Sequence, residues 1–156
     1  MVSISIDQAC TRADIDEVLA LFVEYLKILN TDFGKAVGCA DSQSDMQNFP
    51  AHYAALFLAK LDGEPVAACG LIRVSEQDCE LVRLYCRPQG RGHGLGRKIS
   101  EAACDYAKDN EYKRLVLSTE PIMEHAVKLY KSMGFTDIEN YAEAPSACSK
   151  YMGLVL

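Results

Sequence analysis

The chain has 156 residues, of which 49% are hydrophobic, and a formal net charge of −6. This length suffices for one domain that buries roughly 70% of its unfolded surface, and we expect a single domain over residues 1–156. The acidic balance argues against nucleic-acid binding, which depends on an extended positive surface. We expect no membrane span, which needs about 20 apolar residues, and the N-terminus lacks the long apolar core of a signal peptide.

The seven cysteines form an odd set without a Cys-x-x-Cys pair, which argues against a disulfide framework and a zinc site. Most of them resemble small buried hydrophobes of a reducing compartment, so we expect a cytoplasmic protein. The three histidines lie far apart in the sequence, and we expect no metal.

Strand-like and helix-like segments alternate along the chain. Met1–Ile6 alternates like a strand, and Thr11 with Asp14 resembles a capping box before a helix over about 12–29. Residues 30–53 show no sustained period, and we expect a loop with one short helix. The remaining predicted elements are strands 55–61 and 65–74 with a turn at Asp62-Gly63, strand 80–86, helix 94–109, strand 114–118, helix 122–133, and two strands within 134–156 joined by a loop at 141–145. This order predicts an α/β fold with a mixed, mostly antiparallel sheet flanked by helices.

Arg87–Ile99 is dense in glycine and basic residues. Glycines allow the backbone to approach a ligand closely, and the unpaired amides that begin the next helix favour an anion, so we expect a phosphate here. Leu81–Ser100 holds five Lys or Arg and no Asp or Glu, which leaves the rest of the chain at about −11. The P-loop pattern fails because Lys98 is followed by Ile99, and no register of the glycines gives the dinucleotide fingerprint.

Three blocks, in order, resemble a known family. Arg91, Gly94 and Gly96 match the Arg-x-x-Gly-x-Gly motif of the GCN5-related N-acetyltransferases. Cys79–Pro88 looks like that family's central strand and its proline, and Ala126–Phe135 is similar to its Ala-x-x-Leu-Tyr-x-x-x-Gly-Phe signature. The resemblance covers roughly residues 55–156 and implies splayed central strands.

The resemblance also implies acetyl-coenzyme A as co-substrate. The loop would hold the pyrophosphate, and the pantetheine arm would pair with the central strand as an added strand does. The residues expected to bind the coenzyme are Leu84, Tyr85, Cys86, Arg91, Gly92, His93, Gly94, Leu95, Gly96 and Arg97. For Arg97 and Lys98 a solvated helix face fits equally well, and His93 is expected to be exposed without a chemical role. Met123 replaces an asparagine that contacts the coenzyme in many members.

Acetyl transfer to an amine requires a neutral amine and a protonated leaving thiolate. Neutralising a lysine-like amine near pH 7.4 costs about 4 kcal/mol, which motivates the search for a base. By resemblance, Glu80 is the candidate base, with pairing to Arg83 or solvent as the alternative. Tyr130 is the candidate general acid toward the coenzyme sulfur, with packing beneath its helix as the alternative.

The acceptor is expected to be a small-molecule primary amine that receives the acetyl group directly. Its site would be formed by residues 30–53, by Glu80 and by Tyr141–Pro145, with Tyr141 and Arg83 as substrate-binding residues. The acidic surface suits a cationic amine, whereas Arg73, Arg83 and Arg87 would suit a carboxylate. A protein lysine or N-terminal acetyltransferase and a non-catalytic acyl-coenzyme A sensor are the alternatives, and we expect a monomer or homodimer.

Overall fold

The computed structural model describes residues 1–33, 48–141 and 150–156. The strands are β1 (Ile4–Gln8), β2 (Ala55–Leu61), β3 (Glu64–Arg73), β4 (Asp78–Cys86), β5 (Arg114–Thr119), β6 (Thr136–Asp137) and β7 (Lys150–Val155). The helices are α1 (Arg12–Ile28), which continues as the π-helical turn η1 (Leu29–Phe33), the 3-10 turn η5 (Pro88–Gly90), α2 (Leu95–Asp109) and α3 (Glu124–Ser132).

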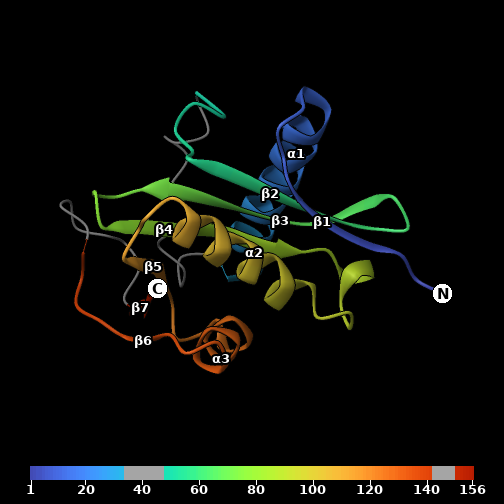
Figure 1. Cartoon of the computed structure of the whole chain (residues 1–156). Coiled ribbons are helices and arrows are strands. Elements are labelled where there is room, and N and C mark those ends of the chain that lie inside the picture. Colours follow the sequence, from blue (N-terminus) through green and yellow to red (C-terminus); the bar gives the residue numbers. More distant parts are fainter. Residues whose placement is uncertain (34–47, 142–149) are drawn as a thin grey trace.

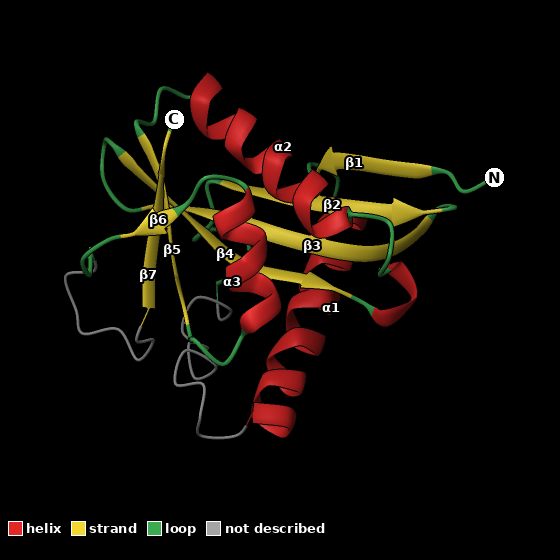
Figure 2. Cartoon of the chain, turned by 90° about the horizontal axis from the view of Figure 1, so that it is seen from below, coloured by secondary structure: helices red, strands yellow, loops and turns green. Residues whose placement is uncertain are grey.

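The described strands form one sheet in the order β1-β2-β3-β4-β5-β7-β6. Every neighbouring pair is antiparallel except β4 and β5, which run parallel. Helix α1 lies on one face of the sheet, and α2 and α3 lie on the other (Figures 1 and 2). The predicted mixed, mostly antiparallel sheet flanked by helices is confirmed.

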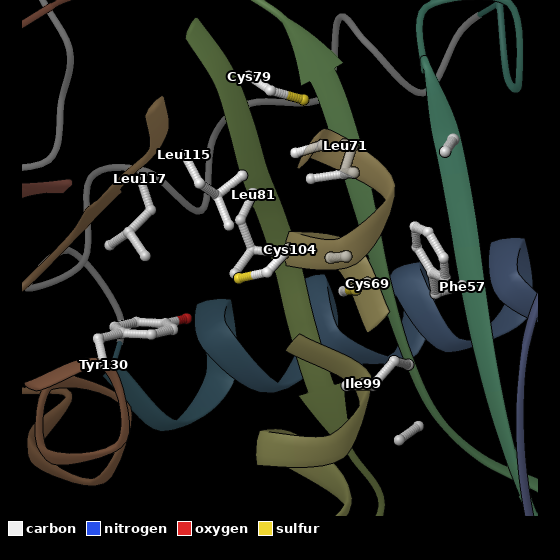
Figure 3. Close-up of a cluster of buried hydrophobic side chains, with 14 of the residues drawn as sticks. Phe57, Cys69, Leu71, Cys79, Leu81, Ile99, Cys104, Leu115, Leu117 and Tyr130 are labelled. Carbon is white, nitrogen blue, oxygen red and sulfur yellow. The ribbon is translucent and has the colours of Figure 1, made fainter. Parts of the chain in front are cut away.

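Successive side chains of β2 and β3 point to opposite faces of the sheet, so the buried residues of these strands divide between two clusters. Phe57 and Cys69 face α2 and join the larger cluster, part of which Figure 3 shows, whereas Leu56 and Ala68 face α1. Helix α2 contributes residues spaced by four, since Leu95, Ile99, Ala103 and Ala107 are all buried. This spacing follows from the helical period and explains why the sequence pattern located the helix.

The ends of the elements differ slightly from the expected ones. The first strand is Ile4–Gln8 rather than 1–6, because the register with β2 pairs Ile4 with Leu61 and Gln8 with Phe57. Thr11 caps α1 as predicted, with its Oγ1 accepting from the Asp14 amide at 3.2 Å. One of the predicted C-terminal strands is only the two-residue β6, which pairs with β7 at Gly153 and Met152.

The two central strands pair over a short stretch and then separate. Asp78, Cys79 and Glu80 of β4 pair with 114–116 of β5, and no further β4–β5 pair occurs in the described chain although β4 continues to Cys86. Arg114 joins the two strands at the paired end through Nε and Nη2, at 3.1 and 2.8 Å from the two carboxylate oxygens of Asp78. The predicted splay is therefore present, with its closed end at Glu80.

A β-bulge lies in the part of β4 that pairs with β3 and not with β5. The register with β3 skips from Ala68–Tyr85 to Gly70–Val82, so two β4 residues stand opposite one β3 residue. Arg83 has a φ of 54°, a left-handed conformation that is uncommon for a side chain of this size. After the bulge, Leu84 and Cys86 pack with the α2-side cluster, whereas Tyr85 is buried on the α1 side.

Candidate active site

The glycine-rich loop leads from the open end of the splay into α2. Gly92 and Gly94 have φ angles of 86° and 68°, and a side chain at either position would meet no atom within 4 Å. Gly94 is the N-cap of α2 and supplies no capping side chain. The Lys98 amide makes the first helical bond, to the Gly94 carbonyl at 3.1 Å, so the amides of residues 95–97 precede the helical ladder. This geometry suits an anion at the positive end of the helix dipole.

Gly90 places this loop against the sheet. A Cβ at this position would lie 2.9 Å from Cβ of Val66 and 3.1 Å from Sγ of Cys86. The loop therefore starts at the carboxyl end of β4 with backbone packed directly on β3, which only glycine permits.

The basic residues of the loop have different surroundings. Arg91 and Lys98 are exposed. Arg97 instead pairs with Glu101 at 3.2 Å and donates to Ser132 Oγ at 3.0 Å, so its guanidinium lies along the α2–α3 flank. His93 is half-buried, which corrects the expectation that it would be exposed.

Tyr130 lies on α3 beside the splay. Its ring packs against Phe135 with centroids 5.6 Å apart, and Figure 3 shows its hydroxyl directed from α3 toward β4. Burial raises the pKa of this phenol, so it stays protonated at neutral pH.

Glu80 is half-buried and is the last β4 residue paired with β5. Tyr141 donates its hydroxyl to Glu80 Oε2, and the same hydroxyl shares a hydrogen bond with Ser118 of β5. Burial, and then the charge of Glu80, raise the pKa of Tyr141. The structure thus joins the predicted base to a predicted substrate-binding residue that lies 61 positions away.

The other predicted substrate-binding residue points toward the aromatic residues on the α1 side. Arg83 Nε donates to Tyr53 Oη at 3.2 Å. The Tyr53 ring packs against Phe22 and Phe49, with centroids 5.7 and 5.4 Å away. Tyr53 therefore lies beside Arg83. That residues 30–53 form the acceptor site stays a prediction, and 34–47 and 142–145 fall outside the described residues.

Glu24 of α1 is a residue that the sequence did not single out. Its Oε2 accepts from Tyr85 Oη at 2.7 Å and from Arg87 Nε at 2.9 Å, and Arg87 Nη1 also donates to the Pro65 carbonyl at 3.0 Å. Arg87 is therefore bound to an acid of the protein itself. The sequence offers no signal for this contact, because Glu24 precedes Arg87 by 63 positions on an otherwise ordinary helix.

Both the sequence and the fold of this chain match those of known proteins. The family model described as "Acetyltransferase (GNAT) family" matches residues 22–135. The chain belongs to the GNAT acetyltransferases. An uncharacterised N-acetyltransferase of Schizosaccharomyces pombe is 30% identical over 97% of this chain and 94% of its own. One from Escherichia coli is 34% identical over 58% of this chain and 54% of its own.

Solved GNAT structures share the fold. An acetyltransferase from Streptococcus agalactiae superposes with a TM-score of 0.78 at 20% identity, over 98% of both chains. A GNAT family acetyltransferase from Elizabethkingia anophelis with acetyl-CoA bound gives 0.66 at 18% identity, again over 98% of both chains. N-acetylglutamate synthase from Neisseria gonorrhoeae, complexed with coenzyme A and N-acetyl-glutamate, gives 0.71 at 18% identity over 99% of this chain and 35% of the synthase.

The described residues contain no group of three or more His, Cys, Asp or Glu side chains placed to hold a metal ion. In those same parts of the chain, every helix is too short or too polar to span a bilayer.

Proposed function

We propose that this acetyltransferase moves an acetyl group from acetyl-CoA directly to the primary amine of a small molecule. The observation that carries the proposal is the splay between β4 and β5. The splay is closed at Glu80, leads to the uncapped N-terminus of α2 at the other end of β4, and has the buried hydroxyl of Tyr130 beside it.

The loop would hold the pyrophosphate of the coenzyme. The free space at Gly92 and Gly94 admits a ligand to the backbone, and the amides that begin α2 supply donors. Arg91 adds an exposed guanidinium next to these amides. Residues 84–86 have no partner on β5 in the described chain, so the amides of the pantetheine arm can pair with this edge.

The reaction would proceed in the splay. The nitrogen lone pair of the neutral amine attacks the thioester carbonyl carbon, the C–N bond forms and the C–S bond then breaks. Glu80 accepts the proton that the amine gives up, directly or through water, and Tyr130 donates its phenolic proton to the departing thiolate. Protonation of the sulfur makes the coenzyme a better leaving group. Glu80 then releases its proton to solvent and Tyr130 regains one from solvent, so both groups return to their starting states.

A half-buried carboxylate at the closed end of the splay favours a cationic amine that approaches from the α1 side. The solved N-acetylglutamate synthase, which contains N-acetyl-glutamate, supports the view that this fold can accommodate a small acylated amine.

The test is an acetylation assay with the purified chain. Acetyl-CoA is incubated with a pool of small primary amines and, separately, with a mixture of peptides, while released thiol is measured and products are identified by mass. We expect thiol release that depends on an amine, together with an acetylated small molecule. Acetylation of peptides alone would point to a protein acetyltransferase, and tight binding without thiol release would point to a sensor.

A further inference from the structure

In the described part of the chain, a side chain from outside the two central strands lies at the closed end of the splay. The last β4–β5 pair is Glu80 with Val116, and Ser118 follows two residues later on β5. Tyr141 follows β6, donates its hydroxyl proton to Glu80, and accepts from Ser118 a hydrogen bond that lowers the Tyr141 pKa. A single phenol therefore bridges β4 and β5 where their own pairing stops.

The position of this phenol is fixed by packing. The ring of Tyr141 meets that of Tyr151 on β7 edge to face, with centroids 5.9 Å apart and an angle of 87°. Tyr151 pairs in turn with Ser118 across the β5–β7 ladder. Burial and the neighbouring carboxylate raise the pKa of Tyr141, so its hydroxyl remains a donor throughout the physiological range.

Arg114, Cys79 and Tyr151 are ionisable groups that lie near Glu80 or Tyr141. Arg114 lies near Tyr141, and its guanidinium is bound through two nitrogens to Asp78. The adjacent thiol of Cys79 has a pKa raised to about 12 by burial, so it is uncharged at neutral pH. The electrostatic effect of Tyr151 also raises the pKa of Tyr141. A hydrogen bond donated to a carboxylate stabilises its ionised form.

We propose that Tyr141 is a positioning residue for the base, which keeps Glu80 ionised and fixes the orientation of its carboxylate, and that it does not bind the acceptor. The catalytic meaning of this role rests on the proposed function, because it assumes that Glu80 accepts a proton from the amine. The bridge itself is a property of the folded chain alone. The two can therefore be tested separately.

The direct test is an NMR titration of the side-chain carboxyl carbons in protein labelled at glutamate, with the Glu80 signal assigned by its loss in Glu80→Gln. Tyr141→Phe keeps the ring on Tyr151 and removes the donor. We expect the titration midpoint of Glu80 to rise by about one to two pH units, the shift that corresponds to losing a hydrogen bond to a charged group. Ser118→Ala should shift it in the same direction by less.

Tyr106→Phe is the matched control, because that hydroxyl donates to the Ala54 carbonyl at 3.2 Å on the α2 side of the sheet. It should leave the Glu80 midpoint unchanged. An unchanged midpoint in both Tyr141→Phe and Ser118→Ala would overturn the proposal. This titration needs neither coenzyme nor acceptor, so a failure of acetyl-CoA binding would defeat the proposed function and leave this result standing.

With a productive amine, kinetics give a second readout. Glu80 acts as a base only when deprotonated, so Tyr141→Phe should move the acidic limb of kcat/KM to higher pH and leave KM for acetyl-CoA unchanged. A raised KM for the amine with an unmoved acidic limb would show instead that Tyr141 contacts the acceptor.

Discussion

At the scale of single residues, Tyr130 and Glu80 lie in contrasting surroundings that suit opposite proton transfers. The phenol of Tyr130 is buried and its pKa is raised by that burial. Glu80 is half-buried and receives a donated hydrogen bond from Tyr141. Burial favours the neutral, protonated form of Tyr130, and the hydrogen bond from Tyr141 favours the charged, deprotonated form of Glu80.

Tyr130→Phe tests the general acid. Since the ring contact with Phe135 is kept, we expect binding of acetyl-CoA and the thermal midpoint to stay near those of the parent. Turnover should fall by ~10² to 10⁴-fold, with kcat and kcat/KM reduced together, because the proton is needed only as charge develops on sulfur. Steady-state kinetics beside a calorimetric titration measure both quantities. A loss of turnover below about threefold would mean that Tyr130 serves packing alone.

At the scale of elements, hydrogen bonds and ring stacking join α1 to the end of β4, just before the glycine-rich loop. Glu24 accepts from Tyr85 and Arg87, and Tyr25 stacks on Tyr85 with centroids 5.2 Å apart. Burial alone would raise the pKa of Glu24, but the hydrogen bonds from Arg87 and Tyr85 outweigh it, and the pKa lies below its ordinary value of 4.5. Burial, and then the same carboxylate, raise the pKa of Tyr85 to about 12.

Glu24→Gln should lower the free energy of unfolding by about 1 kcal/mol at pH 7, a modest value because the side chain is 37% exposed. The pKa of Glu24 is lower in the folded state, so this contribution is complete above about pH 4.5 and disappears as the pH falls through the folded-state pKa. Urea unfolding at neutral and acid pH measures the difference. Glu17→Gln, an exposed acid on the same helix, is the control. A difference that persisted unchanged in acid would refute the role of the carboxylate.

The elements could be located from sequence largely because hydrophobic period and turn residues are local signals. Leu95, Ile99, Ala103 and Ala107 mark α2 by their spacing, and Asp62-Gly63 marks the turn between β2 and β3. The contact of Glu24 with Arg87 and that of Tyr141 with Glu80 could not be predicted in this way. Each joins residues more than 60 positions apart, and only the assembled sheet brings them together.

At the scale of the whole molecule, the proposed site depends on one parallel pair in the sheet that the described strands form, whose other neighbouring pairs are antiparallel. Because β4 and β5 pair over three residues only, the rest of β4 offers backbone to a ligand, and the loop that follows turns into the N-terminus of α2. Motif order predicted this arrangement through the family resemblance. Strand alternation could not, because it assigns side chains to faces and says nothing about where two strands part.

The central claim is that acetyl-CoA binds in this splay with its pyrophosphate on the glycine loop. A calorimetric titration of acetyl-CoA into the parent, Gly94→Asn and Gly63→Asn tests it. Both glycines have positive φ and open space at Cβ, and asparagine tolerates that conformation, so the two variants differ chiefly in location. We expect micromolar binding to the parent and to Gly63→Asn, and a Kd at least about tenfold weaker for Gly94→Asn, a difference of ~1.4 kcal/mol. Equal binding by Gly94→Asn, or a parent that prefers ATP or NAD, would contradict the account.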